Sequence, residues 1–537
     1  MQQTAEPWKS AGDGDAAADV ASMRPECGWL SHGPLIFSLI ALYLGLHFVL
    51  RLLLSPTLGI DDAEQILFAQ QWAFGYRFRQ PPLFTWLLFP VVQWLGPSVL
   101  AVSIIRYVLL AATYGFLYLA ALRWIDDRRL AALSVFSFSL IYVFAYFAHH
   151  DLTHTTALGA MIAASLFVFT KLSEERKTHH YLLLGVCFGL GMLAKWNFVM
   201  LAAGLPLTCL LLPDYRSLVW HWKSLLTIAA VVLIVSPTAL WMFDHGQTAS
   251  GVSSDILSGI DDPSGIEVMF RGGAAMLTSL ALFPMPFLLI FLALFGRTLV
   301  HHGREMLAQQ ATGSATGFLG WLMLVILGLH VLLILMFGAV NFTERWMHPA
   351  LMVLPIYLFA RLSPCRPSGK AISFYLGVIA IFVAVAIGAR LYRYAEGADE
   401  CGKCREFAPF AALAADLRAA GFESGTIVAD GMHIGGNLRV AFPESRIIDP
   451  AFPLVLWPSG DDLDDGAEGM CLLVWRDDRP DATARREAML RFASDQLNVP
   501  ASFDRESGRA EAMLLRSSKR RYGLGFELIR ENRGGCR

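Results

Sequence analysis

Five polar segments interrupt an otherwise apolar chain, and their side chains are of the kinds that bind phosphate and move protons. The candidate residues are Asp61, Asp62, His150, Asp151, His154, Lys195, Arg271, Glu344, Arg345 and His348. A carboxylate can deprotonate an acceptor hydroxyl or amine, which then attacks a sugar carbon. Lysine and arginine can bind the phosphate on that carbon and stabilise its charge as it leaves. These residue types therefore indicate sugar transfer from a phosphate-linked donor at lipid headgroup depth.

The composition is that of an integral membrane protein. Of the 537 residues, 55% are hydrophobic and 16% are charged, and the mean hydropathy is +0.49. Soluble domains carry about 25% charged residues. The net charge is −2 and the sequence contains no basic block. Membrane lipids are therefore expected partners, and nucleic acid is not.

Eleven apolar segments approach the length of about 20 residues that crosses a bilayer. They lie near residues 34–54, 98–122, 129–148, 152–172, 180–195, 196–213, 224–243, 273–296, 318–338, 347–361 and 371–391. If the N-terminus is cytoplasmic, lysine and arginine are concentrated in the inner loops, as the positive-inside rule requires. The C-terminus then lies outside. The run Thr85–Leu95 is too short to span and contains Pro90, so we expect an interfacial or re-entrant helix there.

These spans divide the chain into a tail, a membrane domain and an outer domain. We expect a cytoplasmic tail over 1–33, a transmembrane domain over 34–392 with a periplasmic loop over 55–97, and a periplasmic α/β domain over 393–537. In the last part charge, glycine and proline all increase and no further segment could span, so we expect it to lie outside the membrane. Its length is enough for one small globular domain.

Within the C-terminal domain, residues 406–420 have helical spacing and stop at Gly421. The runs Gly425–Asp430 and Met470–Trp475 are typical of short buried strands. In an oxidising compartment cysteines tend to form disulfides. We therefore expect a short-loop disulfide between Cys401 and Cys404 of the C-x-x-C. Cys471 and Cys536 could also pair with each other, and the sequence leaves that pairing open.

In this topology all five polar segments fall on the outer side of the membrane. No expected span has an acid at its centre, which argues against a proton or ion relay. We therefore expect a cavity at the outer interface. Histidine pairs are common metal ligands, so His149, His150 and His154 could hold a divalent metal ion with Asp61 or Asp151. The alternative is that these histidines face water or backbone, and that no cofactor is needed.

The stretch that begins at Asp61 reads D-D-A-E-Q-I-L-F-A-Q-Q-W-A-F-G-Y and is followed closely by Q-P-P-L. It resembles the first periplasmic loop of GT-C membrane glycosyltransferases, in the group of the lipid A aminoarabinose transferase and the protein O-mannosyltransferases. That loop opens with Asp-Glu-Ala, continues as an aromatic amphipathic helix and closes with Gly-Tyr and Pro-Pro-Leu. The residues that fit are Asp61, Ala63, Gly75, Tyr76, Pro81, Pro82 and Leu83. Asp62 replaces the usual Glu, and Gln80 replaces a common His or Lys, which puts a ligand role for position 80 in doubt.

Three later motifs resemble the same family in the same order. Asp151 lies in H-H-D-L-T-H, Lys195 ends the glycine-rich run G-L-G-M-L-A-K-W-N, and Arg345 lies in E-R-W-M-H-P. The resemblance covers residues 34–361. It implies a GT-C fold and a polyprenyl-phosphate-linked sugar donor that is used at the periplasmic face.

The resemblance also implies roles for the candidate residues. Asp61 would be the catalytic base, Asp151 would position the acceptor or the base, and Lys195, Arg271 and Arg345 would bind the donor phosphate. The supporting residues near the acceptor would be Asp62, His150, His154, Glu344 and His348. Plainer roles are open as well, because aspartates at helix starts act as caps and a lysine at a helix end can extend to the interface.

We therefore expect a polytopic α-helical membrane protein of the GT-C fold with about 11 transmembrane helices, in a bacterial inner (plasma) membrane. Its activity would be that of an inverting hexosyl- or pentosyltransferase with a lipid or glycan acceptor such as lipid A. Direct displacement with a single base is the reason to expect inversion. A transporter or flippase of lipid-linked sugars is the alternative, but it would favour acids at mid-membrane and an internal repeat. A scaffold protein would leave the outer carboxylates without a use.

Overall fold

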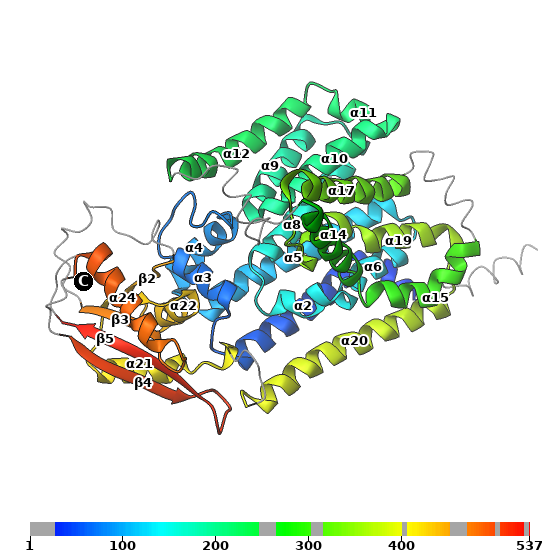
Figure 1. Cartoon of the computed structure of the whole chain (residues 1–537). Helices are drawn as coiled ribbons and strands as arrows, with labels where there is room; N and C mark the ends of the chain where they lie inside the picture. The colour runs from blue at the N-terminus through cyan, green and yellow to red at the C-terminus, as the bar shows by residue number, and fades with distance from the viewer. Residues whose placement is uncertain are drawn as a thin grey trace, which may run out of the picture.

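The structure is a computed structural model that describes residues 27–245, 265–301, 315–399, 405–451, 470–499, 505–530 and 536. Within these residues six helices are long and apolar enough to cross a membrane. They are α2 (Gly33–Leu54), α5 (Val99–Trp124), α8 (His154–Glu174), α12 (Ser224–Asp244), α17 (Ala315–Phe337) and α20 (Gly369–Glu396). These helices form the large helical part of the molecule (Figure 1). The prediction of a polytopic helical membrane protein is confirmed.

The other five expected spans are shorter or interrupted helices in the described part of the chain. These helices are α6 (Arg128–Phe136), α9 (Thr178–Ala194), α10 (Val199–Leu211), α14 (Gly265–Leu282), α15 (Phe287–His301), α18 (His348–Leu351) and α19 (Leu354–Leu362). Pro284 and Pro286 lie between α14 and α15, and proline cannot donate the backbone hydrogen bond that a continuous helix needs. The run expected to form an interfacial helix is a single short helix, α4 (Leu83–Leu95).

The segment near 129–148 differs from the expectation of one continuous helix. After α6 it continues as η2 (Ser137–Leu140), α7 (Tyr142–Ala145) and η3 (Phe147–His149). The Ser137 hydroxyl donates to the Leu133 carbonyl at 2.7 Å, and such local bonds compete with helix hydrogen bonding. The remaining short helices are η1 (Gly28–Ser31), η4 (Trp196–Phe198), α11 (Pro213–Val219), η5 (Glu344–Met347), η6 (Ser363–Cys365) and η7 (Arg405–Phe407).

The C-terminal part contains a five-stranded sheet with the order β2-β1-β3-β5-β4. The strands are β1 (Gly425–Ala429), β2 (Arg446–Ile448), β3 (Met470–Arg476), β4 (Glu506–Met513) and β5 (Arg521–Ile529). β1 pairs in parallel with β2 and with β3, whereas β5 is antiparallel to both β3 and β4. The helices of this part are α21 (Phe410–Ala419), α22 (Met432–Ala441) and α24 (Ala482–Leu497).

The alternation of side chains along β3 explains why both faces of this sheet are covered. Leu472 and Val474 pack into the same apolar cluster as residues of α21 and α22, whereas Leu473 and Trp475 pack with Met489 of α24. Successive side chains of a strand point to opposite faces, and strands buried on both faces are nearly continuously apolar. The two apolar runs predicted as strands are therefore confirmed as β1 and β3.

A disulfide joins Cys471 of β3 to Cys536, with a Cα–Cα distance of 5.2 Å. It ties the C-terminal end of the chain to the sheet. The sequence had left this pairing open. Cys401 and Cys404 lie outside the described residues.

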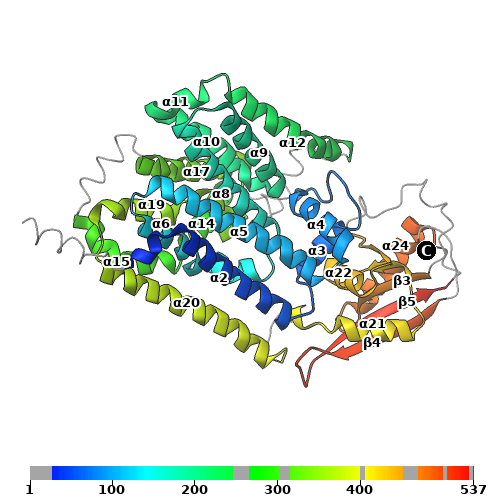
Figure 2. The ribbon, with the colours of Figure 1, turned by 180° about the vertical axis from the view of Figure 1, so that it is seen from behind.

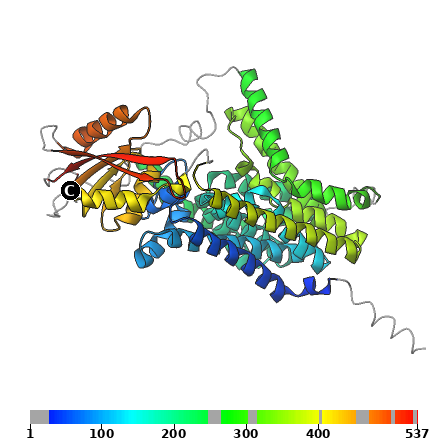
Figure 3. The ribbon, with the colours of Figure 1, turned by 90° about the horizontal axis from the view of Figure 1, so that it is seen from below.

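The short helix α3 (Ile60–Phe68) lies between the helical bundle and the C-terminal domain. Figures 1 and 2 show α3 next to α22, and Figure 3 shows the sheet beyond one end of the bundle. A Cβ added at Gly436 of α22 would lie 2.4 Å from the Ala63 carbonyl oxygen, so only glycine permits this approach. Asn437 of α22 also accepts a hydrogen bond from the Leu58 N–H at 2.9 Å. The domain is thus packed directly against the first polar loop.

Candidate active site

Asp62 fastens α3 to the membrane helices. Its carboxylate is ion-paired with Arg106 of α5 and lies 3.5 Å from the guanidinium of Arg51 at the end of α2. The Asp62 side chain is 1% exposed, and Arg106 is fully buried. Removing one partner of such a buried pair costs about 3–5 kcal/mol, because the other charge is left uncompensated. Asp62 therefore positions the helix.

Asp151 caps α3 and holds its first turn. Its carboxylate accepts hydrogen bonds from the N–H groups of Ile60 at 3.3 Å and Asp61 at 3.0 Å. A carboxylate at a helix N-terminus is stabilised by the exposed N–H groups and by the helix dipole. Gly59 makes room for it, since an added Cβ there would lie 2.2 Å from Asp151 Oδ1. The plainer role considered for Asp151, a cap on the following span, is wrong, because Thr153 occupies the N-cap position of α8.

Asp61 lies in the first turn of α3, beside this cap. Its carboxylate makes no hydrogen bond to any described residue, so it does not act as the helix cap. Burial, followed by the negative charge of Glu64, raises the pKa of Asp61 to about 6, while the charges of Arg345 and Lys195 oppose the rise. Burial and then the charge of Asp61 also raise the pKa of Asp151. A carboxylate with a pKa somewhat below neutrality is well matched to general-base catalysis.

Lys195 and Arg345 reach this group from separate polar segments. Lys195 Nζ donates to the Thr155 hydroxyl of α8 at 3.1 Å. The Arg345 carbonyl accepts from Asn197 at 3.3 Å and is also 2.9 Å from His348 Nδ1. Its guanidinium lies 6.0 Å from the centre of the Phe147 ring. The two cations therefore come from different elements that are held against each other, and both influence Asp61 electrostatically.

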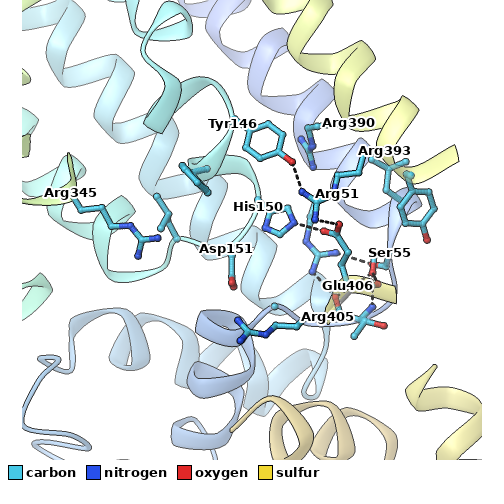
Figure 4. A pocket seen from close by; sticks show the side chains of 16 residues that line it. Arg51, Ser55, Tyr146, His150, Asp151, Arg345, Arg390, Arg393, Arg405 and Glu406 are labelled. Atoms are coloured by element: carbon cyan, nitrogen blue, oxygen red, sulfur yellow. Dashed lines mark hydrogen bonds and ion pairs between the residues drawn. The ribbon is translucent and has the colours of Figure 1, made fainter. Parts of the chain in front are cut away.

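A cavity of about 380 Å³ opens beside Asp151. Five arginines line it, together with His150 and the carboxylates of Asp151 and Glu406. The arginines are Arg51, Arg345, Arg390, Arg393 and Arg405. In Figure 4, Asp151 lies between Arg345 on one side and the group around Glu406 on the other. This cavity, which we call the arginine cavity, is suited to a ligand with more than one negative charge.

Glu406 crosslinks one wall of the arginine cavity. It is ion-paired with His150 and with Arg393, the latter at 2.8 Å. Arg393 also donates to the Tyr146 hydroxyl at 3.0 Å (Figure 4). Arg390 lies 2.9 Å from His47 Nδ1. These contacts join α2, α20, the broken segment before α8 and the start of the C-terminal domain.

Four of the five arginines were missed by sequence reasoning. Arg51 was counted as part of the first span and Arg390 as part of the last, whereas Arg393 and Arg405 fell just beyond it. The signal that could have found them is their position, since Arg51 and Arg390 both lie near the C-terminal ends of their helices, α2 and α20. Sequence alone does not place two helices side by side when they are more than 300 residues apart.

The remaining predicted site residues are His154, His348, Glu344 and Arg271, and they differ in their positions. His154 is buried, does not line the arginine cavity, and has its Nε2 2.9 Å from the Gln65 side chain. His348 Nδ1 is 2.9 Å from the Arg345 carbonyl, and its ring contacts that of Phe283. Glu344 and Arg271 are not among the residues that line the arginine cavity. Arg271 instead forms an ion pair with Glu267 at 2.5 Å on α14, where its side chain is 55% exposed.

The three histidines considered as metal ligands point to different partners. His149 is buried and stacks on His47 with ring centres 3.8 Å apart. His150 pairs with Glu406, and His154 with Gln65. Among the residues that the structure describes, no group of three or more His, Cys, Asp or Glu side chains converges to hold a metal ion. The described residues therefore offer no set of ligands for the metal ion that the sequence suggested.

Together, the helical bundle, the cavity of arginines and carboxylates at its junction with the C-terminal domain, and that attached α/β domain define a membrane glycosyltransferase of the GT-C fold. The crystal structure of ArnT from Cupriavidus metallidurans bound to undecaprenyl phosphate has the same fold. The TM-score is 0.57 at 13% identity, over 91% of this chain and 97% of that chain. Residues 79–241 match the family described as dolichyl-phosphate-mannose-protein mannosyltransferase.

Two relatives define the family more narrowly. Lipopolysaccharide core galacturonosyltransferase RgtA from Rhizobium johnstonii is 32% identical over 470 residues, which are 85% of this chain and 89% of the relative. RgtB from the same organism is 29% identical over 459 residues, covering 84% of this chain and 88% of the relative. The chain belongs to the family of lipopolysaccharide core galacturonosyltransferases. It is a membrane enzyme that transfers a sugar to a lipid or glycan acceptor.

Proposed function

We propose that the protein transfers galacturonic acid from a polyprenyl-phosphate-linked donor to the core sugars of lipopolysaccharide. The observation that carries this proposal is the arginine cavity, which Asp151 and Arg345 line. Asp61 lies in the first turn of α3, and its N–H donates to Asp151. A donor of this kind has two anionic groups, the phosphate and the sugar carboxylate. Arginine binds both in bidentate geometry, and five arginines against two carboxylates leave an excess of positive charge. The galacturonosyltransferase relatives support the choice of sugar and acceptor.

In the proposed reaction, Asp61 accepts the proton of an acceptor hydroxyl. The hydroxyl oxygen forms a bond to the anomeric carbon of the donor, and the bond from that carbon to the phosphate oxygen breaks. The electron pair leaves with the polyprenyl phosphate, and Lys195 and Arg345 stabilise the charge that develops there. A single displacement inverts the anomeric centre. Asp151 orients Asp61 by capping α3.

The same proposal places the reaction at the periplasmic face of a bacterial inner membrane. The C-terminal domain carries the disulfide Cys471–Cys536, and disulfides persist in oxidising compartments such as the periplasm. The arginine cavity and this domain share Arg405 and Glu406, so they lie on one side of the membrane. The domain boundaries at 33 and 392, and the periplasmic loop over 55–97, follow this topology.

The direct test uses the purified full-length protein in lipid nanodiscs. Polyprenyl-phosphate galacturonic acid labelled in the sugar is supplied with lipopolysaccharide that has an intact core. We expect label in the lipopolysaccharide and release of polyprenyl phosphate, with the anomeric configuration of the product inverted. Polyprenyl-phosphate glucose is the matched neutral donor. Equal or faster transfer from the neutral donor would overturn the assignment of an anionic sugar.

A further inference from the structure

A second cavity, of about 990 Å³, lies in the C-terminal domain. It opens at the carboxyl ends of the parallel strands, where Asp430 follows β1, Asp449 follows β2 and Asp478 comes shortly after β3. β2 and β3 both follow β1 in the sequence, and in the sheet they lie on opposite sides of β1. In α/β sheets ligands bind at this kind of topological switch point, outside the carboxyl ends of the strands. We call it the sheet-edge cavity.

The wall of the sheet-edge cavity is strongly charged and mixed in sign. Six arginines and four aspartates contribute to it, among them Arg405, Arg479, Asp430 and Asp449. Arg485 pairs with Asp430 at 2.6 Å and with Asp481 at 2.8 Å. Within the described ranges, Arg405 and Arg479 have no ion-pair partner. The wall thus keeps unpaired positive charge after its internal pairs are formed.

The wall also keeps hydrogen-bonding capacity that the chain itself does not use. Asp449 is 1% exposed, yet its Oδ2 has no hydrogen-bond partner among the described residues. Asp449 Oδ1 accepts the Ala451 N–H at 2.9 Å, so the carboxylate is held in place. Buried polar atoms are nearly always satisfied, and exceptions call for an explanation. A polyhydroxylated ligand would supply partners.

The sheet-edge cavity adjoins the candidate active site. Ile60, the residue before Asp61, lines it, and Arg405 lines both cavities. A molecule that occupies the sheet-edge cavity therefore lies close to the base on α3. The cavity belongs to the domain beyond the membrane helices (Figure 1), so a soluble headgroup can reach it whereas a polyprenyl chain remains in the bilayer. Its volume is at the upper end of the range of ligand pockets, about 300–1,000 Å³.

We propose that the sheet-edge cavity binds the anionic glycan of the acceptor, and that this binding presents a glycan hydroxyl to Asp61. The negative groups of the glycan pair with Arg479 and Arg405, and its hydroxyls bond to the polar wall near Asp449 and His433. This inference rests on the proposed function for the identity of the acceptor. It adds a specific acceptor site on the C-terminal domain, which adjoins the arginine cavity that receives the donor and shares Arg405 with it.

The test compares Arg479→Ala and Asp449→Asn with the wild type. We expect the KM for core lipopolysaccharide to rise about tenfold in each variant, because each variant loses one charge-assisted hydrogen bond to the acceptor. The kcat and the KM for the donor stay unchanged. Arg491→Ala is the matched control, since Arg491 is an exposed arginine on α24 and does not line the cavity. An unchanged acceptor KM in both variants, with normal wild-type transfer, overturns the inference.

A binding experiment keeps the test independent of the donor. Core oligosaccharide released from lipopolysaccharide by mild acid is titrated into the full-length protein without donor, and maltoheptaose is the neutral probe. We expect the core oligosaccharide to bind the wild type and the Arg491→Ala control, and to bind Arg479→Ala at least several-fold more weakly. Dephosphorylated core oligosaccharide shows whether phosphate or carboxylate is recognised. Equal binding of maltoheptaose overturns the anionic glycan site, whereas absent transfer with retained core binding overturns only the proposed function.

Discussion

At the scale of single residues, the acids at and near α3 have different environments. Asp62 is neutralised by Arg106 and Arg51, and Asp151, outside the loop, holds the backbone of α3. Glu64 is paired with Arg77 at 2.7 Å. Only Asp61 among these four has a carboxylate without a hydrogen bond or ion pair in the described part of the chain. It is therefore the carboxylate that is free to accept a proton.

Asp61→Asn is expected to lower kcat by about 10²–10⁴-fold, the usual contribution of a general base. Asparagine keeps the size of the side chain, and Asp61 makes no side-chain bond that the fold needs, so the thermal unfolding midpoint should stay the same. The rate is measured as labelled sugar transferred to lipopolysaccharide. Donor binding serves as the control. Transfer at a near-normal rate would remove Asp61 from the role of base.

The pH dependence of transfer follows from the same carboxylate. A base must be ionised before it can accept a proton, and burial raises the pKa of Asp61 to about 6. As the pH falls through 6, the protonated fraction grows, so kcat/KM is expected to decrease on the acid side and to level off above neutrality. The measurement is a pH–rate profile under conditions in which the protein stays folded. A profile that is flat through pH 6 would contradict this assignment.

At the scale of elements, α3 is the part that the rest of the site depends on. Asp62 fixes it to α5, Asp151 caps its N-terminus, and α22 packs on its other side through Gly436. A helix of only nine residues is not stable alone. Its orientation, and hence the place of Asp61, is set by these three contacts.

Gly59→Ala tests the cap of α3. The added methyl group would lie 2.2 Å from Asp151 Oδ1 and must displace the carboxylate. We expect a loss of about 1 kcal/mol of stability, the value of an N-cap, together with a clear fall in transfer rate. Gly45→Ala is the matched control, because nothing lies within 4 Å of a Cβ there. Thermal unfolding and transfer are measured for both. Equal behaviour of the two variants would show that the cap is not required.

At the scale of the whole molecule, the C-terminal domain completes the site. It supplies Arg405 and Glu406 to the arginine cavity, and its α22 covers α3. It also accepts hydrogen bonds from the loop after α2, where Ser55 Oγ donates to the Glu406 carbonyl at 2.7 Å and Thr57 Oγ1 to the Ala408 carbonyl at 2.9 Å. Loss of order in this domain should therefore affect catalysis as well as stability.

Reduction of the Cys471–Cys536 disulfide is expected to destabilise the C-terminal domain. For a sequence separation of 65 residues the loss is about 4 kcal/mol in the chain-entropy account. The measurement is the unfolding midpoint of a Cys471→Ser, Cys536→Ser double variant. The control is Cys187→Ser, Cys209→Ser, which removes two free cysteines of the membrane helices. A midpoint equal to that of the control would contradict the structural role of the disulfide.

Much of the architecture could be predicted because it depends on local properties. Hydropathy summed over about 20 residues identified the long helices, and short apolar runs identified β1 and β3. Hydropathy did not predict where a helix breaks inside an apolar run. Local hydrogen bonding accompanies the break in the segment near 129–148, and prolines separate α14 from α15. The proximity of the segments that hold Asp61, Asp151, Lys195 and Arg345 was also predicted, because the positive-inside rule assigns these loops to the same side.

By itself, then, the sequence determined that this is a membrane protein with acids and cations in the segments between its helices, and its motifs indicated the glycosyltransferase family. Only the tertiary structure decided which of those residues meet. It brought Arg51, Arg390 and Arg405 to one cavity, left Arg271 paired on its own helix, and made Asp62 a structural anchor. The physical reason is that hydropathy is a sum along the chain, whereas ion pairing depends on distances of a few ångströms between helix ends. Those distances are set by packing.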